Sequence, residues 1–212
     1  MVMKRGYFIS FEGPEGSGKT TQARKLVAKL EKQERPVIYT REPGGTQVGE
    51  LIRGILQHDQ VDEAIFSETE ILLFASSRAQ LVRKVINPTL EAGSWVVCDR
   101  FTDSTLAYQG YARGLDISAL KRINDFAVGN NYPSLTILLD IDFESGFKRL
   151  HQRGEKPDRI ERESRPFHEK VRQGYLEIAR AEPQRFCILD ASQDVELVHE
   201  QVLTILKEKS LL

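Results

Sequence analysis

The sequence predicts an α/β fold built on a parallel sheet, and three observations lead to this prediction. Five apolar runs of strand length alternate with longer stretches of helical periodicity, which is typical of βαβ units. The runs are apolar throughout, as expected for strands that are covered on both faces. Each run is followed by a charged residue, in order Glu12, Arg41, Asp99, Asp140 and Asp190. A chain of 212 residues with this pattern fits one domain.

The strands are expected at the apolar runs 7–11, 37–40, 95–98, 135–139 and 186–189. Because the carboxyl ends of parallel strands line the ligand crevice of an open sheet, we expect Glu12, Arg41 and Asp99 to face a ligand. Asp140 and Asp190 are instead expected to cap the helices that follow them.

Helices are expected between these strands, where apolar residues recur at helical spacing. The first, at 19–34, follows a glycine-rich turn, and a long helix at 67–90 has Pro88 near its end. The others are expected at 118–128, 143–151, 165–181 and 195–209.

The composition argues against two classes of partner. Apolar residues make up 40% of the chain, charged residues 29%, and the formal net charge is −1. A dedicated nucleic-acid binder usually carries a strong basic excess, so no nucleic-acid partner is expected. No apolar stretch is long enough to span a bilayer, and the N-terminus lacks the apolar core of a signal peptide. We therefore expect a cytoplasmic protein without a membrane partner.

The glycine-rich turn matches the phosphate-binding pattern GxxxxGK[ST]. Its glycines let backbone N–H groups approach phosphate oxygens, and the following helix adds its positive N-terminal end. Lys19 would supply a charge to the outer phosphates of ATP, and Thr20 a hydroxyl to Mg²⁺. The ATP-binding residues expected here are Gly13, Pro14, Glu15, Gly16, Ser17, Gly18, Lys19, Thr20 and Thr21.

The phosphate loop alone does not name a reaction, because GTPases and motor ATPases share it. The chain lacks the guanine-reading pattern Asn-Lys-x-Asp and is short for a motor. Small kinases and small ATP-driven ligases remain.

Arg78 falls on the apolar stripe of the long helix, four residues after Phe74, so both side chains point the same way. A guanidinium on a buried face needs a partner. One interpretation is an internal salt bridge or a snorkelling arginine. The other is an aromatic ring and a forked donor that together bind a planar base.

Two arginines at strand ends suggest a second anion in the crevice. Asp99, after an apolar strand, is typical of an ATP·Mg²⁺ site, and Arg100 beside it could hold an acceptor phosphate with two of its N–H groups. Arg41 precedes a turn marked by proline and paired glycines, which would expose it at the crevice.

The basic-rich segment 148–165 is interrupted by Gly154 and Pro157. It fits a solvated helix face with ion pairs, and it fits equally a mobile lid whose arginines close over the phosphates. Because an acceptor phosphate is already ionised near neutral pH, a kinase of this kind needs fixed cations more than a strong base.

Together, five motifs resemble the bacterial type of thymidylate kinase from the first strand to the last helix. They are FEG at 11–13, REPGGT at 41–46, FASSR at 74–78, DR at 99–100 and AYQG at 107–110. The resemblance implies a P-loop nucleoside monophosphate kinase-like three-layer α/β fold, with a five-stranded parallel sheet in the order 2-3-1-4-5. It also implies transfer of a phosphoryl group from ATP to dTMP with Mg²⁺, and a homodimer packed through helices.

The resemblance also implies roles for individual residues. Phe74 would stack on thymine and Arg78 would bond its edge, while Arg41 and Arg100 would hold the acceptor phosphate. Asp99 would lie beside that phosphate and, with Thr20, the metal. The other positions expected at the dTMP site are Glu12 near the sugar or metal, Thr105 and Gln109 near the base or sugar, and Tyr108 near the deoxyribose, where it would disfavour a 2′-hydroxyl.

The family places its catalytic arginine either in the phosphate loop or in the lid. This loop has no basic residue between Gly13 and Gly18, whereas the lid has Arg149, Arg153 and Arg159. The chain therefore resembles the lid-arginine type, with Arg149 and Arg153 expected at ATP and Arg153 as the transition-state contributor. The expected catalytic set is Lys19, Arg100, Arg153, Asp99 and Glu12. A kinase for another nucleotide or deoxynucleoside, and an ATP-binding switch that signals through a partner, remain as alternatives.

Overall fold

The sheet is parallel throughout and has the expected order. A computed structural model describes residues 5–57, 63–152, 154 and 156–212. The strands are β1 (Phe8–Glu12), β2 (Val37–Arg41), β3 (Trp95–Asp99), β4 (Leu135–Asp140) and β5 (Phe186–Asp190). They lie side by side in the order β2-β3-β1-β4-β5. The predicted fold class and strand order are confirmed.

Each strand ends one residue later than predicted, so that the charged residue is its last member. Arg41 lies opposite Asp99 across β2 and β3, and Phe11 lies opposite Asp99 across β1 and β3. A charged side chain can end a buried strand because the strand's carboxyl end opens toward solvent or ligand. The phosphate loop and the Asp99-Arg100 turn therefore leave the sheet at the same edge.

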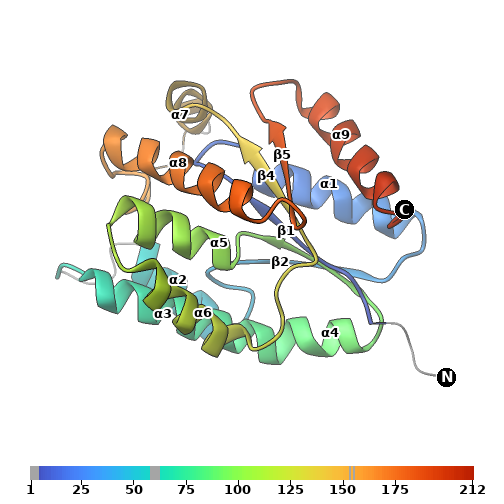
Figure 1. Ribbon diagram of the computed structural model, residues 1–212, viewed down its shortest axis with the longest axis horizontal. Coiled ribbons are helices and arrows are strands. Elements are labelled where there is room, and N and C mark those ends of the chain that lie inside the picture. Colours follow the sequence, from blue (N-terminus) through green and yellow to red (C-terminus); the bar gives the residue numbers. More distant parts are fainter. Residues whose placement is uncertain (1–4, 58–62, 153, 155) are drawn as a thin grey trace.

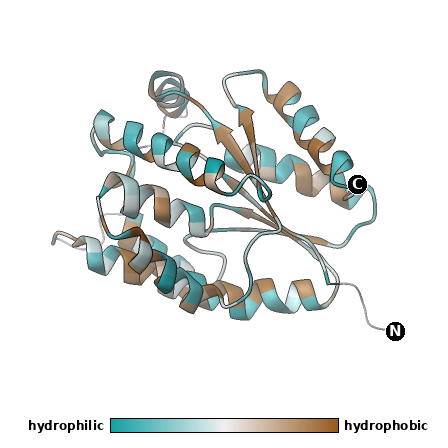
Figure 2. Cartoon of the chain, in the orientation of Figure 1, coloured by the Kyte–Doolittle hydropathy of each residue, from teal (hydrophilic) through white to brown (hydrophobic). Residues whose placement is uncertain are grey.

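Helices cover both faces of the sheet and make three layers (Figure 1). On one face lie α1 (Lys19–Lys32) and α9 (Val195–Glu208), whose Leu26, Leu30 and Val202 pack on the strands. On the other face lie α6 (Ile117–Val128) and α8 (Arg165–Ala181), together with the long helix after residue 66. Figure 2 shows the strands as a largely apolar centre between helices of mixed character. Burial on both faces explains the uniformly apolar strands.

The helix expected at 67–90 is divided into three parts. It runs as α3 (Ser67–Leu81), a π-helical segment η1 (Val82–Ile86) and α4 (Asn87–Glu91). The backbone N–H of Asn87 donates to the carbonyl of Val82, five residues back. Pro88 has no N–H for the usual bond to the fourth residue before it, and a wider turn just before it accommodates that loss.

Two helical segments were not predicted. The helix α2 (Gln47–Gln57) contains Gly49 and Gly54, which lower helix propensity. A side chain at Gly49 would lie 2.6 Å from the carbonyl oxygen of Gly44, so glycine is required there by close packing. After Arg100, the short α5 (Thr102–Thr105) continues into the π-helical η2 (Leu106–Ala112).

Neither of the two acids expected as helix caps takes that role. Asp140 does not cap α7 (Phe143–Gln152); instead it accepts two hydrogen bonds, at 2.6 and 2.7 Å, from Arg172 of α8. Asp142 takes the capping role by accepting from the backbone of Ser145. Asp190 accepts from the backbone and hydroxyl of Ser192 in the turn before α9, and Asp194 caps that helix by accepting from the backbone of Glu196.

Candidate active site

A cavity opens at the carboxyl edge of the sheet, between the phosphate loop, the ends of β2 and β3, α3 and η2. Its walls bring together most of the predicted site residues. Those that line it are Glu15, Gly16, Gly18, Lys19, Thr20, Arg41, Phe74, Arg78, Asp99, Arg100, Thr105, Tyr108 and Gln109. One continuous cavity thus joins the predicted phosphate-binding and acceptor-binding residues.

The phosphate loop curls around the Lys19 side chain. Gly13, Gly16 and Gly18 have φ angles of 145°, 72° and 86°, which only glycine adopts without strain. Lys19 is buried, and its ammonium donates to the carbonyl of Pro14 at 2.7 Å. Burial, and then repulsion by Arg100, lower the pKa of Lys19 to about 8. A polyphosphate bound in the loop would add negative charge beside this ammonium and so favour its protonated form.

Four predicted loop residues do not line this cavity, namely Gly13, Pro14, Ser17 and Thr21. Pro14 borders a neighbouring pocket between α7 and α8, and Ser17 accepts a hydrogen bond from Lys19 at 3.3 Å. Thr21 is exposed on the first turn of α1. Ser17 and Pro14 therefore shape the loop, and their side chains do not face the cavity.

Thr20 and Asp99 lie in contact, the threonine hydroxyl donating to the aspartate carboxylate. In the described part of the chain no three His, Cys, Asp or Glu side chains gather into a metal cluster. Mg²⁺ bound with a nucleotide usually takes only one or two protein ligands and otherwise phosphate and water oxygens. A hydroxyl and a carboxylate side by side at the mouth of a phosphate loop fit such an ion.

Arg100 has an unusual backbone conformation and many partners. Its φ angle is 67°, in the left-handed region, which the surrounding contacts must compensate. Its guanidinium donates to Glu15 at 2.6 Å, and to the Gly13 carbonyl and the Tyr175 hydroxyl at 3.1 Å. The side chain also lies over the Tyr108 ring, 5.1 Å from its centre. Arg100 is thus held at the cavity wall in a defined orientation.

Glu15, expected only among the ATP-binding residues, contacts two residues that are expected at the acceptor. It accepts hydrogen bonds from Arg100 and, at 2.7 Å, from the Tyr108 hydroxyl. Burial raises the pKa of Glu15, but Arg100 and Lys19 outweigh burial and lower it to about 2. A carboxylate is therefore present beside the cation that we expect at the acceptor phosphate.

Glu12, expected near the sugar or the metal, does not line the cavity. It is completely buried and accepts from the Phe101 backbone at 2.6 Å, the Ser104 hydroxyl at 2.7 Å and the Tyr175 hydroxyl at 3.0 Å. Burial, then repulsion by Asp103, raise its pKa to about 7. Surrounded by protein donors, Glu12 supports the turn after β3, and its role near the sugar or the metal stays a prediction.

Arg78 forms the internal salt bridge of the first interpretation, while the base-binding role of the second stays a prediction. It is 1% exposed and forms a salt bridge of 2.7 Å with Glu42, and it also donates to the Asn124 side chain at 2.6 Å. Burial raises the pKa of Glu42 to about 7 in spite of Arg78. Arg78 also lines the cavity, as does Phe74 one turn earlier on the same helix. Glu42, whose role no local pattern in the sequence indicates, is the buried partner that a guanidinium on an apolar stripe requires.

The outer wall contains Arg41, which pairs with Glu50 of α2 at 3.0 Å. Thr105 lies deeper, and within the described residues its buried hydroxyl oxygen has no hydrogen-bond partner. Such an atom is costly to leave unpaired and is suited to a ligand. Asp158 also borders the cavity. It was not predicted, because it lies in a segment that was interpreted from its many basic residues.

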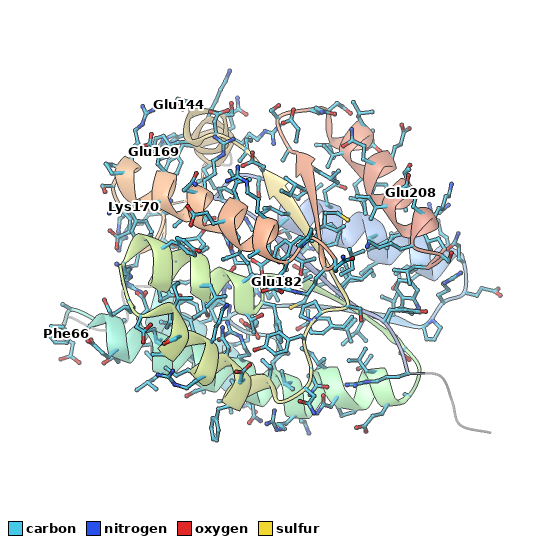
Figure 3. The ribbon with its side chains drawn as sticks, in the orientation of Figure 1. Phe66, Glu144, Glu169, Lys170, Glu182 and Glu208 are labelled. Atoms are coloured by element: carbon cyan, nitrogen blue, oxygen red, sulfur yellow. The ribbon has the colours of Figure 1, made fainter. Side chains whose placement is uncertain are left out.

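The predicted lid is only partly helical, since α7 ends at Gln152. Arg149 donates to the carbonyls of Ala191 at 2.7 Å and Ser192 at 3.2 Å, and it does not line the cavity. Arg153 lies outside the described residues. At the far end of the segment, Arg165 forms exposed ion pairs with Glu144 and Glu169. Figure 3 shows these two glutamates at the outer edge of the molecule. Exposed pairs of this kind hold a segment weakly.

Many known proteins are similar to this chain over nearly its whole length. The thymidylate kinase family model matches residues 11–202. The chain belongs to this family. Curated thymidylate kinases of Pelotomaculum thermopropionicum and Deinococcus radiodurans are 50% and 46% identical to it, and the matches cover 96% and 98% of this chain and 94% and 99% of theirs. It is therefore an enzyme of the dTMP kinase class.

A solved structure supports the same family assignment. The crystal structure of thymidylate kinase from Ehrlichia chaffeensis has a TM-score of 0.77 and 35% identity, covering 96% of this chain and 99% of that one. Within the described residues, no helix combines the length and apolar character needed to cross a membrane.

Proposed function

We propose that the chain transfers the γ-phosphoryl group of ATP to the phosphate of dTMP within this cavity. The observation that carries the proposal is the junction of the phosphate loop with an acceptor pocket lined by Phe74, Arg78 and Arg100. An ATP bound at the loop and a nucleotide monophosphate beside Arg100 would bring two phosphate groups together over the Thr20–Asp99 contact.

Each group has a role that its position supports. Lys19 and the loop N–H groups hold the β- and γ-phosphates, and Thr20 and Asp99 hold the Mg²⁺ that accompanies ATP. Mg²⁺ supplies positive charge to the phosphate oxygens. Arg100 and Arg41 hold the acceptor phosphate, whose oxygen attacks in line. No strong base is needed, because that phosphate is already ionised, and catalysis reduces to positioning and charge stabilisation.

The groups around the nucleoside would give the acceptor its specificity. Phe74 offers a ring face to the base, and Arg78 offers an N–H to its edge. Tyr108, held by Glu15, would pack against the deoxyribose. We place the enzyme in the cytoplasm, because its phosphoryl donor ATP is available there.

Coupled ADP release with ATP and Mg²⁺ tests this function. We expect dTMP to be much the best acceptor when it is compared with dUMP, UMP and deoxythymidine at equal concentration. Equal rates with all acceptors, or no acceleration by dTMP at millimolar concentration, would contradict the proposal.

We also propose that Arg153 stabilises the transition state from the lid, because the phosphate loop has no basic residue between Gly13 and Gly18. Arg153→Ala should lower kcat by about a hundredfold while changing dTMP affinity little, since a charge that acts mainly in the transition state contributes little to ground-state binding. Steady-state kinetics and dTMP titration measure the two quantities. The control is Arg162→Ala in the same segment, and a loss confined to dTMP affinity would make Arg153 a binding residue.

We further propose that the chain forms a homodimer through the outer faces of α3 and α6. Leu72 and Phe126 are 59% and 85% exposed there, beside a shallow apolar groove that Ala75, Ala79 and Ile123 also line. Apolar patches of this kind mark association surfaces. A second copy of the chain would cover the groove with an identical apolar face.

Phe126→Asp should convert the dimer to a monomer, because it places a charge at the centre of the proposed contact. Light scattering after size-exclusion chromatography measures the mass in solution. Leu197→Asp, at an apolar residue of α9 that is 45% exposed, is the matched control and should remain dimeric. A monomeric wild type, or a dimeric Phe126→Asp variant, would contradict the proposal.

A further inference from the structure

Glu70 is a completely buried carboxylate that borders the acceptor pocket without lining it. It lies on the first turn of α3 and contacts side chains from two other parts of the chain, namely the C-terminal end of η2 and the lid segment. Its Oε1 accepts from Gln109 at 2.8 Å and from Nε of Arg113 at 2.7 Å. Its Oε2 accepts from Nη2 of Arg113 at 3.1 Å and from Arg159. Because both oxygens are held, the carboxylate cannot rotate.

The same contacts keep Glu70 ionised. Burial alone raises the pKa of its carboxyl group, but the hydrogen bond and charge of Arg113, and then the hydrogen bonds from Arg159 and Gln109, outweigh burial and lower it. Glu70 is therefore a carboxylate at neutral pH, and a carboxylate can only accept hydrogen bonds.

An acceptor-only partner determines how Gln109 is oriented. The side-chain amide of Gln109 has a donor end, NH₂, and an acceptor end, the carbonyl oxygen. Only the NH₂ end can face Glu70, so the carbonyl oxygen is the end that remains for a ligand. Gln109 is 2% exposed and lines the cavity beside Thr105 and Arg78, where the base of the acceptor would lie.

The orientation of this amide matters because pyrimidine bases differ at N3. Thymine and uracil carry a hydrogen on N3 and donate there, whereas cytosine has a lone pair on N3 and accepts. A fixed carbonyl oxygen can accept from N3–H, but it would face the cytosine lone pair without a hydrogen between them. A buried site built for a hydrogen bond rejects analogues that cannot form it.

We propose that Glu70 is a positioning residue that holds the carbonyl oxygen of Gln109 toward the acceptor base and so selects pyrimidines with an N3–H over cytosine. This inference rests on the proposed function, since it needs dTMP in the cavity. The salt bridges to Arg113 and Arg159 keep the carboxylate in place, and through Arg159 they also connect it to the lid segment.

The test compares kcat/KM for dTMP, dUMP and dCMP in wild type and Glu70→Gln. A glutamine at position 70 can donate as well as accept, so the amide of Gln109 can turn over. We expect the preference for dTMP over dCMP to fall by about tenfold or more. The preference for dTMP over dUMP should change by less than about twofold, because both bases carry N3–H.

Two further variants distinguish a positioning role of Glu70 from a nonspecific disturbance of the structure. Glu163→Gln removes the other carboxylate on Arg113, 3.0 Å away, and should leave the dTMP to dCMP ratio unchanged. In a Gln109→Leu background, Glu70→Gln should have no further effect on that ratio, since coupled residues are not additive. An unchanged dTMP to dCMP ratio in folded Glu70→Gln would overturn the inference. It would also be overturned if Glu70→Gln changed that ratio as much in the Gln109→Leu background as in the wild type.

If Glu70→Gln does not fold, as circular dichroism would show, Glu70→Asp decides the question. It keeps the charge for both arginines but draws the carboxylate away from Gln109. A lower dTMP to dCMP ratio supports the inference and an unchanged ratio overturns it. A wild type that does not phosphorylate dTMP would instead contradict the proposed function itself.

Discussion

Replacing Lys19 with alanine should lower kcat by about a thousandfold while the fold stays intact. The ammonium lies inside the phosphate loop, where it would neutralise charge on the transferring phosphoryl group in a site that excludes water. Removing one preorganised cation or donor from such a site costs roughly 3–4 kcal/mol of transition-state stabilisation. Steady-state kinetics of ADP release with ATP and dTMP measures the loss.

The matched control is Lys25→Ala on the same helix, since Lys25 pairs with the exposed Glu196 and lies outside the cavity. It should retain kcat within about twofold, as expected for a surface ion pair. An unchanged kcat in Lys19→Ala would remove Lys19 from the chemistry.

The lowered pKa of Lys19 gives a second measurement on the same residue. ATP binds the charged ammonium, but with a pKa of about 8 the free enzyme loses this charge as the pH rises through that value. ATP binding above pH 8 should then take up a proton, and its affinity should fall with rising pH. Calorimetric titrations in two buffers of different ionisation enthalpy count the protons, and Lys19→Ala should abolish the uptake.

Replacing Arg100 with alanine should lower kcat/KM for dTMP by about a hundredfold or more, through both a higher KM and a lower kcat. The guanidinium would bind the acceptor phosphate in the ground state and stabilise its charge during transfer. The variant also leaves Glu15 without its cationic partner, so a carboxylate would then repel the incoming phosphate.

Arg100→Lys separates charge from geometry, because lysine keeps the charge but not the forked donors. It should recover only part of the lost activity. Arg83→Ala, which removes a guanidinium that donates to the Ala127 carbonyl on another face, is the control and should behave like wild type. If Arg100→Ala kept kcat/KM within about threefold, this arginine would not hold the acceptor phosphate.

The features that the sequence alone determined are local ones. The phosphate loop could be read from residues 13–20 because its conformation depends on closely spaced glycines and the helix that follows them. The strands could be read because a strand buried on both faces must be apolar along its whole length. The π-helical turn before Pro88 and the glycine-containing α2 were missed, since there the tertiary packing overrides helix propensity.

Only the tertiary structure decided which acids face the cavity and which support it. Glu12 and Glu15 are three positions apart, yet the fold turns Glu12 toward Ser104 and Tyr175 and brings Glu15 to Arg100. The partner of Arg78 is 36 residues away in sequence, and Glu70 and Arg159 are 89 apart. Such pairings depend on how the chain folds back across the sheet, so no local pattern of residue types contains them.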